Sequence, residues 1–181
     1  MNARRRQHGL GLLEVLIALV VVSLGVLGMA GLQLTGMKHS SSGFNRSKAL
    51  LFAENMAVRM RINEPGVAHY AGFDSAAADA PDCAVRPDPY CQTSASGAAA
   101  SCDAEELAGF DQWSVACGDW GDGTVAGEGV VNALPAGRLR VECGDAACAT
   151  YTISVEWREA STTSRTAGAI DAKRVQLRLR P

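Results

Sequence analysis

The chain has 181 residues, of which 48% are hydrophobic and 20% are charged, and its formal net charge is −2. Arg4, Arg5 and Arg6 supply three of its 17 basic residues, so the remainder, with 19 acidic residues, is more acidic than the total indicates. This length predicts one globular domain with an appendage, and the acidic body argues against non-specific nucleic-acid binding, so no direct nucleic-acid contact is predicted.

An uncharged apolar segment follows the three arginines. Residues 15–34 read VLIALVVVSLGVLGMAGLQL, and twenty helical residues span the ~30 Å of a hydrocarbon core. The arginines place the preceding end in the cytoplasm. We therefore predict a leader over residues 1–9 and a transmembrane helix over residues 10–35, with everything later across the membrane. A plain signal anchor is the alternative.

Glu14 lies among apolar residues at the start of this segment. A charge at the centre of a membrane helix costs ~2.5–3.5 kcal/mol and less near the interface, so an ionisable group there indicates a function. The alternative is a side chain that reaches the headgroups without any further role. Gly9 stands five residues before Glu14 and directly after the basic leader.

The run Gly9-Leu10-Gly11-Leu12-Leu13-Glu14 resembles the N-terminal motif of type IV prepilins and pseudopilins, with Leu10 where most members carry Phe. The resemblance implies cleavage between Gly9 and Leu10 by prepilin peptidase and N-methylation of Leu10. Cleavage would create an amine at Leu10 one helical turn from Glu14. In a bundle of such helices, Glu14 of one subunit would pair with the amine of its neighbour. Breaking such a buried pair costs ~3–5 kcal/mol, so Glu14 is predicted to set the register of assembly.

Later segments are similar to minor pilins of the PilV type, the type IV pilus modification proteins: ENMAVRMRINEPG, AEELAGFDQW and YTISVEW. The resemblance implies an α+β, type IV pilin-like fold, with a long N-terminal helix packed on a C-terminal antiparallel sheet. It also implies a minor subunit at or near the pilus tip that helps to initiate assembly and supports twitching motility and adhesion. The protein would be a single-pass inner-membrane protein with a periplasmic head, later carried to the cell surface in the pilus. The implied partners are other minor pilins, the major pilin, a tip adhesin and the inner-membrane assembly platform.

The long helix is expected to continue through an amphipathic half over residues 36–64. Met37, Phe44, Leu51 and Val58 recur every seven residues, and we predict that this stripe lies on the head. The apolar face is widened by Phe52, Met56 and Met60. Pro65-Gly66 is predicted to end the helix.

The head, residues 65–181, is predicted to contain a long loop, one helix and three strands. The loop covers residues 66–101, and the helix begins near Asp103 with Glu106 as its capping-box partner. Alternation of apolar and polar residues predicts antiparallel strands at residues 139–143, 151–157 and 175–179, with a polar loop at residues 160–171. Arg178 and Arg180 are expected to mark a protected sheet edge; a subunit contact is the alternative.

All six cysteines lie in the head: Cys83, Cys91, Cys102, Cys117, Cys143 and Cys148. An even number beyond a membrane segment predicts disulfides in an oxidising compartment. Cys143 and Cys148 flank a short turn and are expected to pair. The pairs Cys83–Cys91 and Cys102–Cys117 follow only as the sequence neighbours that remain, and other connectivities stay open.

The sequence offers no catalytic machinery, so no enzyme activity, metal or cofactor is predicted. Its three histidines are His8, His39 and His69, and the hydrolase and redox motifs are missing. The acidic residues Asp119, Asp122 and Glu128 do not match a calcium-binding loop. The competing functions are a minor pseudopilin of a type II secretion system and an ordinary secreted or signal-anchored periplasmic protein. For the secreted form, Gly28-Met29-Ala30 could serve as a signal peptidase site.

Overall fold

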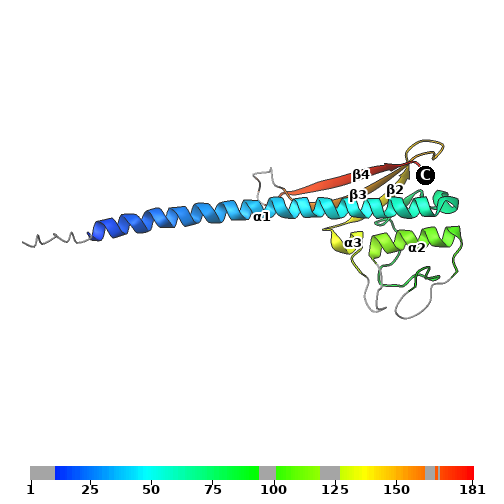
Figure 1. The fold of residues 1–181 in the computed structure, drawn as a ribbon, viewed down its shortest axis with the longest axis horizontal. Helices are drawn as coiled ribbons and strands as arrows, with labels where there is room; N and C mark the ends of the chain where they lie inside the picture. The colour runs from blue at the N-terminus through cyan, green and yellow to red at the C-terminus, as the bar shows by residue number, and fades with distance from the viewer. Residues whose placement is uncertain (1–10, 94–100, 119–126, 162–165, 167) are drawn as a thin grey trace, which may run out of the picture. The chain divides into compact units, whose positions relative to one another are not determined.

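The computed structural model describes residues 11–93, 101–118, 127–161, 166 and 168–181. The chain divides into two compact units, residues 1–41 and 42–181. The helix α1 (Leu12–Ile62) contributes to both units, and each unit is described by itself (Figure 1).

The first unit consists of the N-terminal part of α1. Every side chain described from residue 11 to residue 41 is exposed. This part of α1 is long and apolar enough to cross a membrane, judged from length and composition alone. Residues 15–34 contain no proline and no charge, so nothing in them interrupts a helix in an apolar surrounding.

The second unit contains a four-stranded antiparallel sheet in the order β1-β2-β3-β4. Its strands are β1 (Phe73–Asp74), β2 (Arg138–Cys143), β3 (Tyr151–Ala160) and β4 (Ile170–Leu179). The register between β3 and β4 is continuous from Tyr151 opposite Leu179 to Ala160 opposite Ile170. The three predicted strands are confirmed, and the fold is the predicted α+β arrangement. The polar loop is shorter than predicted, because cross-strand pairing holds both of its ends in the sheet.

One face of the sheet packs on the second half of α1 (Figure 1). The strands contribute alternate apolar residues, among them Leu139, Val141, Ile153 and Val155. The helix meets them with small or flexible side chains: Ala49, Ala53, Met56, Ala57 and Met60. All nine of these residues are at most 1% exposed, so this interface is the main core of the head.

The face of α1 that packs on the head is not the predicted one. Phe44, Leu51 and Val58 are 60%, 64% and 50% exposed. Met56 and Met60, which were expected only to widen the stripe, lie in the core together with three alanines. The prediction failed because heptad spacing identifies an apolar stripe without showing what covers it, and alanine can pack more closely than larger side chains.

Local structure also replaces part of the predicted loop. A 3₁₀ helix, η1 (Glu64–Tyr70), follows α1 directly, with Pro65 in its first turn. Proline is favoured there, because its fixed φ suits a helix start and its missing N–H removes no bond. The short strand β1 then pairs with β2. Both elements are too short for a periodicity argument to find.

The helix α2 (Ala104–Cys117) begins as predicted. The Asp103 carboxylate accepts hydrogen bonds from the backbone N–H groups of Glu105 and Glu106, at 3.0 and 2.9 Å. The Glu106 carboxylate accepts one in return from the N–H of Asp103, at 2.9 Å. This capping box satisfies N–H groups that the first turn leaves unpaired. A one-turn helix, α3 (Val130–Ala133), precedes β2.

Candidate functional site

Glu14 lies in the first turn of α1 and is exposed. Its backbone N–H donates to the carbonyl of Gly11 at 3.0 Å, so the turn that carries the carboxylate is formed. Among the described residues, no side chain bonds the Glu14 carboxylate. The positive end of the helix dipole favours an acidic residue at this position. Glu14 is therefore presented on an ordered turn. Gly9 and Leu10, the predicted cleavage site, lie outside the described residues.

An apolar stripe runs along α1 within the second unit. We define the outer stripe as Phe44, Leu51, Val58 and Ile62, which are all at least half exposed. Their spacings of seven, seven and four residues keep them on one side of the helix. That side is opposite the alanines and methionines that pack on the sheet. The helix therefore has two apolar faces, and the head covers only one of them.

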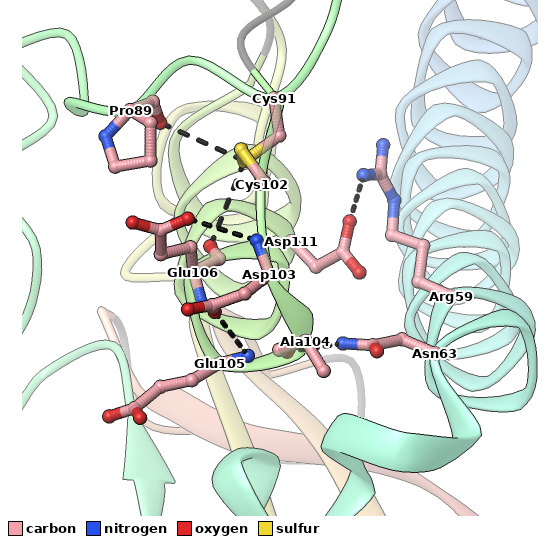
Figure 2. The surroundings of a disulfide bond; sticks show 10 residues. All are labelled: Arg59, Asn63, Pro89, Cys91, Cys102, Asp103, Ala104, Glu105, Glu106 and Asp111. Atoms are coloured by element: carbon pink, nitrogen blue, oxygen red, sulfur yellow. Dashed lines mark hydrogen bonds and ion pairs between the residues drawn. A yellow bond between two sulfur atoms is a disulfide. The ribbon is translucent and has the colours of Figure 1, made fainter.

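Polar contacts hold α1 against η1 and α2. Arg59 donates to the Asp111 carboxylate on α2 at 2.6 Å, and the Tyr70 hydroxyl donates to the other oxygen of that carboxylate at 2.5 Å. Asn63 donates to the carbonyl of Ala104 at 2.7 Å. Burial, together with the hydrogen bond to Asp111, raises the pKa of Tyr70 above its usual value. Figure 2 shows Arg59 on α1 pointing toward Asp111 on α2, and Asn63, which directly follows α1, pointing toward Ala104 at the start of α2.

Three disulfides stabilise the head, and Cys143–Cys148 is the pair expected from the sequence. The other two are Cys83–Cys117 and Cys91–Cys102, so the expected pairs Cys83–Cys91 and Cys102–Cys117 are wrong. Cys117 ends α2 and Cys102 precedes its capping box, so the two cysteines lie at opposite ends of the helix. A 14-residue helix is about 21 Å long, which is too far for a disulfide between them.

The disulfide Cys91–Cys102 fixes the segment before α2 close to the cap of that helix (Figure 2). Cys83–Cys117 joins the other end of α2 to the same preceding segment. Between them, Tyr90 packs edge-to-face on Phe110 at a centroid distance of 5.1 Å. With Trp113 these rings form a second small core. The two disulfides therefore attach to α2 a segment whose described residues, 75–93 and 101–103, contain no helix or strand.

The hairpin between β2 and β3 is closed by Cys143–Cys148 and by Asp145. The Asp145 carboxylate accepts hydrogen bonds from the backbone N–H groups of Ala147, Ala149 and Thr150, and from the Thr150 hydroxyl. These donors, above all the Thr150 hydroxyl, lower the pKa of Asp145. The turn is thus fixed by covalent and polar contacts while its surface stays exposed.

The described part of the chain contains no group of three or more potential metal ligands. Glu128, considered above as a calcium ligand, pairs with Lys48 at 3.0 Å. Asp119 and Asp122 lie outside the described residues. His69 is 3.9 Å from Glu105 at the surface of the head. The polar clusters of the described residues join structural elements of the second unit.

Two family models match consecutive parts of the chain. The model described as a prokaryotic N-terminal methylation motif matches residues 4–30, and the model described as type IV pilin Tt1218 matches residues 31–113. The chain belongs to the type IV pilins. Type IV pilins are structural subunits, and the methylation motif implies processing by prepilin peptidase and assembly with other pilins. No curated protein and no solved structure matches the chain.

The sequence located the N-terminal motif of this pilin but missed two features of its head. The sequence pattern revealed the apolar stripe but wrongly predicted that it packs on the head, where the alanines and methionines of α1 pack instead. The polar contacts around Asp111 went unpredicted, since Arg59 and Asp111 are 52 positions apart and no local pattern links them. The signal available in retrospect was an acidic residue among the largely apolar residues of α2, since a buried acidic side chain requires a partner.

Proposed function

We propose that this type IV pilin is a minor pilin of the PilV type, which helps to initiate pilus assembly at or near the tip and supports twitching motility and adhesion. It is made as an inner-membrane protein with one membrane span and a periplasmic head. Prepilin peptidase removes residues 1–9, and the new N-terminus at Leu10 is methylated. The mature chain, with residues 10–35 as its membrane segment, then joins the filament.

The observation that carries the proposal is the position of Glu14. An exposed carboxylate on the first turn of an apolar helix has an energetic cost in a membrane and has no bond to any described residue. The amine of a processed neighbour at Leu10 would neutralise it. A pair of this kind aligns subunits, because a displaced subunit would leave a charge unpaired.

The outer stripe supports the same proposal from the second unit. Four large apolar residues on the uncovered side of α1 would be unfavourable in a protein that remained a free periplasmic head. In a bundle, the α1 helices of neighbouring pilins would cover the stripe. Removing apolar surface from water contributes ~25 cal/mol per Å², so this packing would stabilise the filament.

The partners that follow from this proposal are prepilin peptidase, the inner-membrane assembly platform, the other minor pilins, the major pilin and a tip adhesin. The match to a type IV pilin model favours a pilus over the filament of a type II secretion system. The likeness of ENMAVRMRINEPG, AEELAGFDQW and YTISVEW to PilV-type proteins supports the minor-pilin assignment.

The experiment that tests the proposal is the intact mass and N-terminal sequence of the protein isolated from membranes and from sheared filaments. A chain that begins at methylated Leu10 and is present in filaments at a small fraction of the major subunit is the expected result. A chain that begins at Met1 would contradict processing. A processed chain that co-purifies only with secretion components would contradict the pilus assignment and retain the prepilin class.

A further inference from the structure

The strand β4 forms a ten-residue edge of the sheet. Its pairing with β3 is continuous and contains no bulge. Among the described residues, no backbone hydrogen bond reaches its other edge. At the opposite edge, the chain around β1 bonds β2: the N–H groups of Gly72 and Ser75 donate to carbonyls of Val141 and Leu139. A long strand with free backbone groups is a template for another strand.

The exposed side of β4 carries a row of arginines. Arg174, Gln176 and Arg178 alternate along it, and Arg180 follows the strand directly; all four are exposed. Arg174 is 3.6 Å from Glu156 on β3. Within the described chain, Arg178 and Arg180 have no ion pair. Alternate residues of a strand are ~6.6–6.8 Å apart. Positive charge therefore recurs along this face at Arg174, Arg178 and Arg180, with the neutral Gln176 between the first two.

The other side of β4 is apolar at the same positions. Val175 and Leu177 are half-buried against the core, and Leu179 is fully buried. Lys173, on the same side, pairs with Asp171 near the start of the strand, at 3.2 Å. The residues that follow on this side, Val175, Leu177 and Leu179, are all uncharged. The edge therefore offers unpaired backbone groups, a cationic row on one face and a partly open apolar surface on the other.

We infer that the free edge of β4 accepts an extended segment of a partner protein in which acidic residues alternate with apolar residues. The segment adds a fifth strand to the sheet, its carboxylates lie opposite Arg174, Arg178 and Arg180, and its apolar side chains extend the core beside Val175 and Leu177. Opposite charges directly across two strands stabilise the pairing. This surface is separate from the outer stripe and does not depend on the proposed function.

The same features disfavour other occupants. A second copy of β4 would place arginines opposite arginines. Like charges opposite one another destabilise strand pairing, so self-pairing of β4 is disfavoured. Nucleic acid would satisfy the arginines but would leave the backbone edge and the apolar face without partners. A polypeptide strand with acidic and apolar alternation satisfies all three features together.

The test uses the full-length protein in detergent micelles and a labelled nine-residue peptide in which Glu alternates with Val. A peptide of the same composition with its Glu and Val residues in separate blocks is the control for charge without alternation. Fluorescence anisotropy measures binding. We expect the alternating peptide to bind at least about tenfold more tightly than the block peptide, because only its alternation matches both faces of β4.

The Arg178→Glu/Arg180→Glu variant should lose at least about tenfold in affinity for the alternating peptide. The Arg46→Glu/Arg61→Glu variant, with the same charge change at exposed positions of α1, should bind as the wild type does. Hydrogen exchange should show new amide protection in β4 when the peptide is present and none in β2. Equal binding of the two peptides, or no new protection in β4, would overturn the inference. So would tighter binding of a 20-base-pair DNA duplex that depends on the same two arginines.

Discussion

The guanidinium of Arg59 on α1 lies 2.6 Å from the carboxylate of Asp111 on α2, and the Asp111 side chain is only 6% exposed. The Tyr70 hydroxyl occupies the second oxygen of the same carboxylate. One acidic side chain thus joins three elements of the head. A buried carboxylate that has lost a partner retains its desolvation cost, so each bond to it matters for stability.

We expect Asp111→Ala to lower the free energy of unfolding of the head by about 1–3 kcal/mol, because Arg59 and Tyr70 would lose a charged partner. The measurement is urea unfolding of the full chain in micelles, followed by tryptophan fluorescence. Arg59→Met completes a double-mutant cycle. Additivity of the two single effects within about 0.5 kcal/mol would contradict a direct interaction.

The disulfide connectivity can be read from a digest with a protease that cleaves before aspartate. Cleavage before Asp82, Asp88, Asp103, Asp111 and Asp119 would produce the peptides 82–87, 88–102 and 111–118. With the observed pairs, peptide 88–102 carries an internal disulfide and peptide 82–87 is joined to peptide 111–118. All three peptides linked in one species would contradict the observed pairs, because both of the other connectivities of these four cysteines produce that species.

The ion pair between Asp74 on β1 and Arg138 on β2 is expected to lose its stabilising effect at low pH. The ion pair with Arg138 holds the pKa of Asp74 below its usual value. A carboxyl with a lowered pKa stabilises the fold above the unfolded pKa of about 3.9, and this contribution is lost as the pH falls through the lower folded value. Asp74→Asn should therefore be less stable than the wild type at pH 7, with the gap closing below about pH 4. Asp79→Asn, at an exposed position, is the control, and a gap that stayed constant with pH would argue against the ion pair.

Glu14→Ala is expected to leave processing intact and to reduce recovery of the protein in sheared filaments. The reason is that the variant lacks the carboxylate proposed to pair with the amine of a neighbouring subunit. Glu14→Asp, which keeps the charge, should retain part of the incorporation. Filament fractions probed with an antibody to the head provide the measurement. Normal recovery of the alanine variant would remove the basis for the pairing.

Substitutions in the outer stripe are expected to reduce assembly into filaments without lowering the stability of the head. Leu51→Ser/Val58→Ser changes two residues that are at least half exposed, so the unfolding free energy of the head should stay within about 0.5 kcal/mol per substitution. Recovery in filaments should fall. Ala53→Leu is the reverse case: at a fully buried site, overpacking should cost about 1–3 kcal/mol. Equal incorporation of the serine variant and the wild type would show that the stripe does not contact other pilins.

The parts of the fold that follow from local patterns were predictable, and those that depend on distant contacts were not. The capping box at Asp103 and the alternation around Leu139 and Ile153 determine a helix start and two strands within a few residues. The cysteine pairs depend on where α2 places Cys102 and Cys117, which sequence adjacency does not reveal. The buried face of α1 was missed for a related reason: Ala53 carries no strong hydrophobic signal, although it is fully buried.

The two apolar faces of α1 differ in what they constrain. The alanine face contacts the chain's own sheet, so a substitution there must be compensated within the same gene. The residues of the outer stripe are at least half exposed and lie outside the core of the head. Under the proposed packing, a substitution there would change mainly how the subunit fits its neighbours. If the stripe packs on neighbouring pilins as proposed, drift in it would alter the choice of filament partners while the head keeps its fold. In this pilin, compatibility between subunits and integrity of the subunit can evolve at different rates along a single helix.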